Sequence, residues 1–162
     1  MKNIQPIGVW EFGGVNTLLD FNILNQDTFN QELCPLVFVD LPTFDSNLDW
    51  IDSELSKIDK PPTIRIGTKS LRCPELINRA IQRKFCKGLF LFHPNEIKYW
   101  QEKYNLDDFL LAYPVITKRA AELIIEGKIR NKNAEIIVVI DSIEHLEVLE
   151  SAIVESGYDI NI

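Results

Sequence analysis

The chain has 162 residues, of which 46% are hydrophobic and 25% charged, a composition typical of an ordinary soluble domain. Its longest apolar runs, 88–92 and 136–140, are far shorter than the roughly 20 residues that cross a bilayer, which argues against a membrane protein. Twenty-four acidic and 17 basic side chains give a net charge of −7, which excludes a general attraction to nucleic acid or anionic lipid.

The cysteines and the first residues bear on the compartment. Cys34, Cys73 and Cys86 are odd in number, widely spaced and form no Cys-x-x-Cys pair. This argues against a disulfide framework and against a structural zinc site, so we expect reduced thiols and no metal. Residues 1–6 lack the charged start and apolar stretch of a secretion signal, so a cytoplasmic location is expected.

Strand-like and helix-like segments alternate from about residue 36 onward. The first 35 residues show no clear period and are predicted to be an irregular segment, so the domain is expected at 36–162. A strand is predicted at 36–40, followed by a helix that starts at Pro42 and Thr43. The apolar residues of this helix recur at spacings of three and four, which predicts one buried face: Phe44, Leu48, Ile51, Leu55 and Ile58.

The same alternation continues to the end of the chain. Short runs rich in β-branched and aromatic residues predict strands at 63–68, 88–92, 109–113 and 135–140. Helical periodicity predicts a helix that opens at Pro74 and Glu75, then helices at 94–103, 117–126 and 143–155. The last of these carries Asp141 and Glu144 as an expected capping box, and 158–162 looks like the start of another strand. This order predicts an α/β fold with a parallel sheet.

The strand at 63–68 brings two basic residues to one face. Strand alternation places Arg65, Gly67 and Lys69 on one side and the apolar residues between them on the other. The apolar side is expected to meet the helices, which leaves the arginine and the lysine facing the interior, where unpaired charge is costly. Ligands of parallel α/β folds bind beyond the carboxyl ends of the strands, where Lys69 lies. An anionic or electrophilic partner is therefore expected, with a lysine that emerges into solvent as the alternative.

The segment from Arg65 to Glu75, Arg-Ile-Gly-Thr-Lys-Ser-Leu-Arg-Cys-Pro-Glu, resembles the cofactor-lysine segment of a known enzyme class. These are the fold type III pyridoxal-phosphate (PLP) enzymes, the alanine racemase-like barrels. The nearest branch is the D-threonine aldolase and D-serine dehydratase-like group, the amino acid deaminase/aldolase family. Similar motifs follow in order over about residues 35 to 150: Val39-Asp40-Leu41 with Asn47, Gly88-Leu89 with His93-Pro94-Asn95-Glu96, Asp107-Asp108 with Ala112-Tyr113-Pro114, and Val139-Ile140-Asp141-Ser142.

The resemblance implies an incomplete (β/α)8 TIM barrel of about four to five βα units, the N-terminal portion of a PLP-dependent amino acid lyase or deaminase. It implies that Lys69 forms the internal aldimine with PLP and acts as a base at Cα, and that Arg65 tunes the cofactor or orients the lysine. A buried structural ion pair is the open alternative for Arg65. Cys73 stands where alanine racemases have a tyrosine, which favours the aldolase and dehydratase branch. The later phosphate-binding loops and a second acid–base group are expected beyond Ile162.

Two other functions stay open. A non-catalytic PLP-binding protein or an inactive fragment is the main alternative, because an imine needs only the lysine and some phosphate contacts. A flavodoxin-like response domain is weaker, because only Asp40 and Asp141 lie at strand ends where it needs clustered acids.

The expected partners follow from the same interpretation. They are a small amino acid substrate and, because a half barrel leaves open sheet edges, either a second copy of the chain or a complementing C-terminal half. Four other polar residues receive no site role: Arg72 is expected in a solvated loop, Tyr113 as rim packing, His93 beside a helix start and His145 on a helix surface.

Overall fold

The computed structural model describes residues 39–157, and the chain divides into two compact units, Met1–Glu54 and Leu55–Ile162. Helix α2 (Leu41–Ser56) accounts for nearly all of the described part of the first unit. Its start is capped by Asp40, whose carboxylate accepts hydrogen bonds from the Thr43 backbone N–H at 3.2 Å and from the Thr43 hydroxyl at 2.9 Å. The predicted helix is confirmed except at its end, because Ile58, expected on its buried face, lies beyond the helix and is 49% exposed. Of the strand predicted at 36–40, residues 36–38 lie outside the described residues, and Val39 and Asp40 form no strand because the chain turns into the helix there.

The second unit consists of four successive βα pairs. They are β1 (Ile64–Gly67) with α3 (Pro74–Ile81), β2 (Cys86–Leu91) with α4 (Asn95–Tyr104), β3 (Asp108–Leu111) with α5 (Lys118–Arg130), and β4 (Glu135–Val138) with α6 (Ile143–Ser156). The strands form one sheet in the order β1-β2-β3-β4, and each neighbouring pair is parallel. The fold is therefore α/β with a parallel sheet, as predicted, and it is consistent with part of a (β/α) barrel. None of the helices in residues 39–157 is long and apolar enough to cross a membrane.

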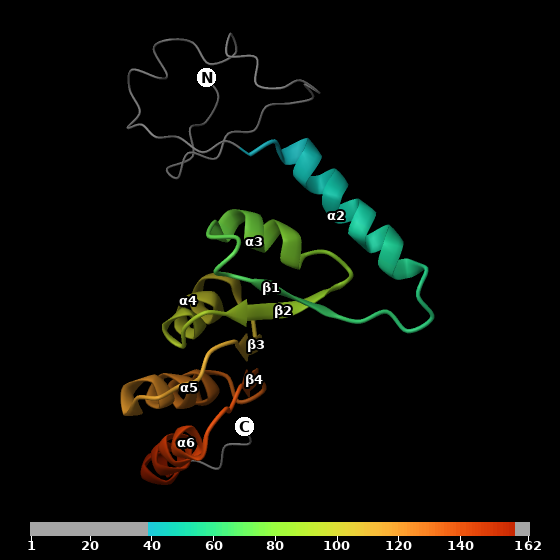
Figure 1. Ribbon diagram of the computed structural model, residues 1–162. Helices are drawn as coiled ribbons and strands as arrows, with labels where there is room; N and C mark the ends of the chain where they lie inside the picture. Colours follow the sequence, from blue (N-terminus) through green and yellow to red (C-terminus); the bar gives the residue numbers. More distant parts are fainter. Residues whose placement is uncertain (1–38, 158–162) are drawn as a thin grey trace, which may run out of the picture. The chain divides into compact units, whose positions relative to one another are not determined.

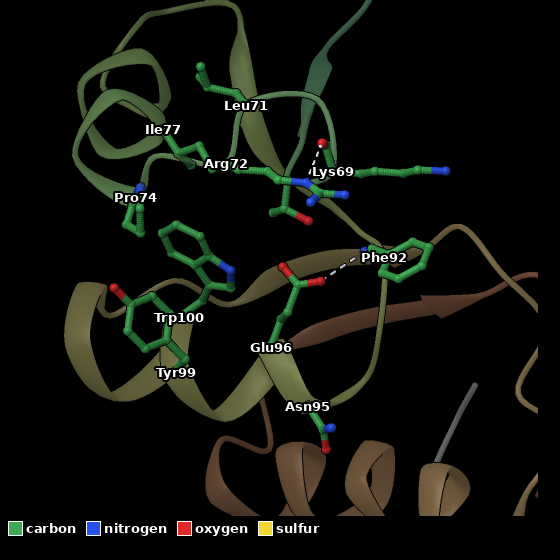
Figure 2. A pocket seen from close by; sticks show the side chains of 11 residues that line it. Lys69, Leu71, Arg72, Pro74, Ile77, Phe92, Asn95, Glu96, Tyr99 and Trp100 are labelled. Carbon is green, nitrogen blue, oxygen red and sulfur yellow. Dashed lines mark hydrogen bonds between the residues drawn. The ribbon is translucent and has the colours of Figure 1, made fainter. Parts of the chain in front are cut away.

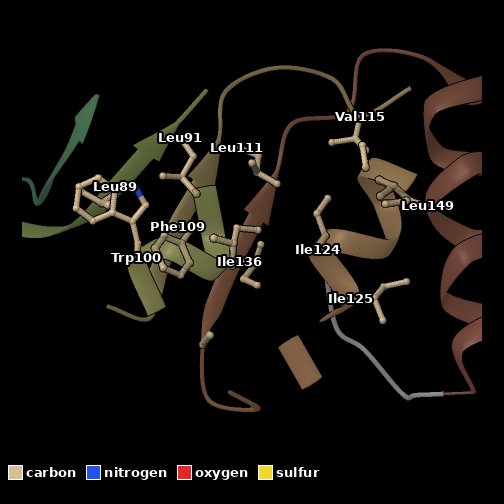
Figure 3. Packing of buried hydrophobic residues seen from close by; sticks show 14 of the residues in the cluster. Leu89, Leu91, Trp100, Phe109, Leu111, Val115, Ile124, Ile125, Ile136 and Leu149 are labelled. Atoms are coloured by element: carbon tan, nitrogen blue, oxygen red, sulfur yellow. The ribbon is translucent and has the colours of Figure 1, made fainter. Parts of the chain in front are cut away.

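The helices cover one face of the sheet. Figure 1 shows α4, α5 and α6 on one side of the strands. Strand residues that point to this side have lost nearly all contact with solvent, among them Leu89, Leu91, Phe109 and Leu111. They pack against helix residues such as Ile97, Trp100, Ala121 and Ile124 (Figure 3). Burial of these side chains is the main source of stability for this unit.

The opposite face of the sheet, which we call the inner face, carries three rows of residues set by the strand register. The amino-end row is Arg65, Gly88, Asp108 and Glu135, and the middle row is Gly67, Phe90, Leu110 and Ile137. Strand alternation continues these into a carboxyl-end row of Lys69, Phe92, Ala112 and Val139. The register skips Lys87, which lies in a bulge of β2.

The end of one helix and the cap of another differ from the sequence prediction. Helix α5 runs to Arg130, beyond the end predicted at Glu126. A Cβ at Gly127 would come within 2.6 Å of Ile97 Cγ2, so this glycine allows α5 to approach α4 closely. Helix α6 is capped by Ser142, whose hydroxyl accepts from the His145 backbone N–H at 3.2 Å, so the assignment of the cap to Asp141 is wrong. The strand expected from residue 158 lies outside the described residues.

Candidate functional site

Lys69 lies just beyond the carboxyl end of β1. The Thr68 backbone N–H still bonds to Phe90 at 3.1 Å, as in the strand, and the chain then turns. In that turn the backbone N–H groups of Ser70 and Leu71 both donate to the Gly67 carbonyl, each at 3.2 Å. Lys69 is thus held in a tight turn at the edge where parallel α/β folds bind ligands, and its side chain is exposed.

The Lys69 amine meets a phenol and two aromatic rings. Its Nζ lies 2.9 Å from Tyr113 Oη, within hydrogen-bond distance. The Nζ is also 5.2 Å from the centroid of the Tyr113 ring and 5.3 Å from that of Phe92, within the range of cation–π attraction. The two rings pack edge to face, with centroids 4.9 Å apart. No carboxylate forms an ion pair with Lys69 in the part of the chain that the structure describes.

Tyr113 is the residue whose contact the sequence analysis missed. It was expected to pack at the rim, and the structure adds its hydrogen bond to the candidate lysine. Tyr113 follows the end of β3 by two residues, so it lies at the same edge of the sheet as Lys69. The signal was present in the sequence, because both residues come directly after strands whose carboxyl ends meet at one edge.

His145 holds the loop that carries Tyr113. Its Nε2 accepts a hydrogen bond from the Val115 backbone N–H at 2.9 Å, and the residue is only 1% exposed. The interpretation of His145 as a surface residue is therefore wrong. Its spacing to Leu149 and Ala152, four and then three residues, places it on the buried face of α6 and could have revealed this.

The accepting Nε2 defines the tautomer of a neutral His145, whose proton is then on Nδ1. That Nδ1 has no hydrogen-bond partner within residues 39–157, and it lies 3.8 Å from Asp141 Oδ1. His145 thus packs between the loop after β3 and the loop after β4.

A cavity of about 520 Å³ lies beside Lys69, between the turn after β1 and the start of α4. Figure 2 shows its lining, in which the Lys69 side chain extends away from Tyr99 and Trp100. Arg72 fixes the turn from one side, because its Nε donates to the Lys69 carbonyl at 3.3 Å. On the other side of the cavity, Glu96 fixes the segment after β2, because its carboxylate accepts from the backbone N–H groups of Phe92 and His93, each at 3.1 Å. The volume is that of a small-molecule site.

Arg65 occupies the other end of the inner face. Its Nε lies 2.5 Å from Asp108 Oδ1, and its Nη2 lies 3.4 Å from Glu135 Oε1. Lys87 lies 3.1 Å from Asp108 and 2.8 Å from Glu135. We call Arg65, Lys87, Asp108 and Glu135 the charge cluster. The hydrogen bonds that Lys87 donates to Glu135 and then to Asp108 raise the pKa of its amine. The guanidinium is thus held in the ion pair that the sequence analysis left open, and its contact with a cofactor stays a prediction.

Gly88 makes this ion pair possible, because it lies between Arg65 and Asp108 in the amino-end row. A Cβ at this position would come closer than 3.0 Å to three atoms of Asp108, including its backbone carbonyl oxygen. The missing side chain lets the guanidinium reach across β2 to the carboxylate.

The other candidate residues have local roles. His93 Nδ1 accepts from the Asn95 backbone N–H at 3.2 Å, beside the start of α4 as expected. Cys73 and Cys86 form no disulfide within residues 39–157, and Cys34 lies outside the described residues. Between residues 39 and 157 no three His, Cys, Asp or Glu side chains come together as metal ligands would.

Comparison with solved structures identifies a related fold. The chain superposes on D-threonine aldolase from Filomicrobium marinum with a TM-score of 0.63 and 20% sequence identity. The match covers 74% of this chain and 30% of the aldolase chain. No protein-family model matches the sequence, and no curated protein does so. At this identity the likeness shows the fold alone, and the chain spans less than a third of the length of the protein it matches.

Proposed function

We propose that the chain binds PLP covalently through Lys69, as a PLP-dependent amino acid lyase or deaminase of the D-threonine aldolase and D-serine dehydratase type. The observation that carries the proposal is the place of the Lys69 amine. It lies at the carboxyl end of the sheet, 2.9 Å from a phenol, and no carboxylate among residues 39–157 neutralises it. The sequence motif around it and the fold of D-threonine aldolase support the same assignment.

The residues present fit such a cofactor. Attack on an aldehyde requires an amine that has lost its proton, and a lysine locked to a carboxylate would keep that proton. Lys69 instead faces a hydroxyl, which can accept from the ammonium form and donate to the neutral amine. Lys69 would hold the cofactor through its Nζ, with the aldehyde oxygen of the cofactor released as water. When bound, PLP supplies the electron sink for negative charge at the amino acid Cα.

Tyr113 and Phe92 hold the Lys69 amine in place. Together their rings and the phenol oxygen limit the positions that a flexible lysine side chain adopts. A lysine that is released when the substrate takes its place would stay next to the reacting carbon, where it can move a proton. Arg65 stays a predicted contributor to cofactor binding, and its ion pair with Asp108 would have to be kept or shared.

Lys103 offers a matched control within the same chain. Its Nζ lies 3.1 Å from Tyr99 Oη and 5.3 Å from the centroids of two tyrosine rings, so it too has a phenol and two aromatic rings beside it. Its hydrogen bonds with Tyr99 and then Tyr104 raise its pKa, and it lies in the last turn of α4 rather than at a strand end. Labelling of Lys69 without labelling of Lys103 would therefore show that an amine beside a phenol is not sufficient for imine formation.

The test is covalent trapping. Purified protein is mixed with PLP, the absorbance band of a lysine imine is recorded, and borohydride reduction is followed by peptide mass mapping. We expect the added mass on Lys69 and none on Lys103. Lys69→Ala should lose the band, and Lys103→Ala should keep it. Equal bands in the wild type and in Lys69→Ala would contradict the proposal.

A PLP-binding protein without turnover is the second candidate. It is favoured by the small share of the aldolase chain that this chain matches, 30%, because binding needs fewer groups than turnover does. Protein that carries the label on Lys69 is incubated with D-threonine and D-serine. Loss of either amino acid, abolished by Lys69→Ala, supports the lyase or deaminase, whereas labelling without consumption selects the binding protein.

A further inference from the structure

The inner face of the sheet is apolar and largely open. Phe90, Phe92, Ile137 and Val139 remain 40%, 45%, 37% and 38% exposed, whereas the helix-facing residues Leu89 and Leu91 are 0% exposed. These four side chains come from β2 and from β4 or its continuation, with Leu110 of β3 between them in the register. Sheets built only from parallel strands have both faces covered in folded proteins. An apolar patch of this kind indicates an interaction surface.

The sheet is also open at its two sides. β1 and β4 are the terminal strands, and each has one neighbour among the described residues. The strands follow one another in sequence order, β1-β2-β3-β4, and all are parallel. This is the order of half of an eight-stranded parallel barrel, in which closure removes both edges.

The charges at the amino end of the inner face are already balanced, and Lys69 lies at the other end. The two cations of the charge cluster, Arg65 and Lys87, pair with its two anions, Asp108 and Glu135. A covering surface therefore need not supply charge at this end, and one with a net charge would leave that charge unpaired. The best complement is apolar in the middle and neutral at the amino end. The inner face itself has these properties.

We propose that a second copy of this chain covers the inner face, with β4 of each copy beside β1 of the other. A twofold axis along the strand direction leaves that direction unchanged, so the strands stay parallel at both new seams. Four strands from each copy then close one ring, and the two inner faces bury each other. Both Lys69 residues come to lie at the same end of this ring.

The first test is the mass of the full chain in solution, measured by light scattering over a concentration series. We expect the wild type to have twice the mass of one chain. Phe90→Lys places a lysine in the middle of the inner face of each copy, where it would be buried without a partner. This variant should have half the wild-type mass, with an unchanged far-ultraviolet circular dichroism spectrum.

Val154→Lys is the matched control. Val154 is 79% exposed and lies on α6, away from the sheet, so this variant should keep the doubled mass. Loss of the doubled mass in Val154→Lys would assign the association to another surface.

Hydrogen exchange of the wild type is the second test, and it does not depend on a variant that folds. Dilution of the doubled species should speed amide exchange in β1 and β4, whose outer edges are paired only in the dimer, more than in β2 and β3. Three results would overturn the proposal: a wild-type mass of one chain at every concentration, a doubled mass in Phe90→Lys, or equal acceleration in all four strands. The first of these would mean that another part of the chain or a different protein covers the face.

None of these measurements involves PLP, so the association and the proposed function can fail independently. The dimer follows from the open face and the strand order, whereas the cofactor follows from Lys69.

Discussion

The two ends of the inner face treat similar side chains in opposite ways. Arg65 and Lys69 are both basic, lie four residues apart and extend from the same face of one strand. At the amino end the guanidinium meets the carboxylates of Asp108 and Glu135. At the carboxyl end the amine meets, among the described residues, the phenol and the rings of Tyr113 and Phe92. Strand alternation therefore creates two inward cations, and the neighbouring strands decide which one meets carboxylates and which one meets aromatic rings.

The interactions of Arg65 and of Lys69 also differ in strength. A guanidinium between two carboxylates is stabilised in its charged form, and breaking such a pair leaves a partly buried charge behind. An amine against a phenol and aromatic rings gains about 0.5–1 kcal/mol from cation–π attraction at an exposed site, which leaves it easy to displace. The amino end is thus suited to hold the sheet together, and the carboxyl end is suited to exchange partners.

The largest effect on stability is expected at Gly88, where the ion pair crosses β2. Gly88→Ala should lower the free energy of unfolding by about 3 kcal/mol, because the new Cβ collides with the backbone and carboxylate of Asp108. Urea unfolding followed by circular dichroism measures this. Gly67→Ala is the control on the same face, where a Cβ would meet Ser70 Oγ at 3.7 Å and Phe90 Cδ1 at 3.8 Å, ordinary contacts. We expect it to change stability by less than about 1 kcal/mol. Equal losses of stability at the two glycines would contradict the view that the Arg65–Asp108 ion pair needs a residue without a side chain at Gly88.

Removal of the central carboxylate should have an intermediate effect. Asp108→Ala leaves Arg65 and Lys87 with Glu135 alone, and we expect a loss of about 2 kcal/mol in the free energy of unfolding. Glu135→Gln is the control, since its side chain is 49% exposed and its ion pairs are screened by water. It should cost less than about 1 kcal/mol. A larger loss in Glu135→Gln than in Asp108→Ala would show that the cluster is organised around the exposed carboxylate instead.

The smallest effect is expected at Tyr113. Tyr113→Phe removes the hydrogen bond to Lys69 and keeps the ring, so PLP affinity should fall by a factor of about 3 to 10, which corresponds to one hydrogen bond. Titration of the imine absorbance with PLP measures it. Tyr104→Phe, on α4 and without a contact to Lys69, should leave the affinity unchanged. An affinity equal to that of the wild type in Tyr113→Phe would show that the phenol oxygen has no part in holding the amine.

Several features of the fold were predictable because they depend on local patterns. The four βα units follow from the alternation of apolar runs with helical periodicity, and Pro74 marks the start of α3 as expected. The prediction failed where residues distant in sequence decide the outcome. Gly127 stays inside α5, where α4 packs against it. The end of the expected first strand has a local cause instead, because Asp40 caps α2 through Thr43, three residues further along.

In the candidate site, too, some features follow from local sequence patterns and others depend on residues distant in sequence. The inward direction of Arg65, Gly67 and Lys69 follows from strand alternation, and the place of Lys69 follows from the end of β1. The contact between Lys69 and Tyr113 spans 44 positions of the sequence, and the contact between His145 and Val115 spans 30. No local pattern specifies such pairs, although the helical spacing of His145 placed it on a buried face.

The sequence by itself determined the strands, the helices and the direction of the two basic residues of β1, because periodicity of two and of 3.6 is a property of the backbone. Only the tertiary structure decided that Arg65 pairs with carboxylates and that Lys69, within residues 39–157, does not. The carboxylates of Asp108 and Glu135 arrive at the start of their strands, whereas the phenol of Tyr113 follows the end of β3. Parallel pairing brings each set to one end of the sheet, so the register places one cation among carboxylates and the other beside a phenol.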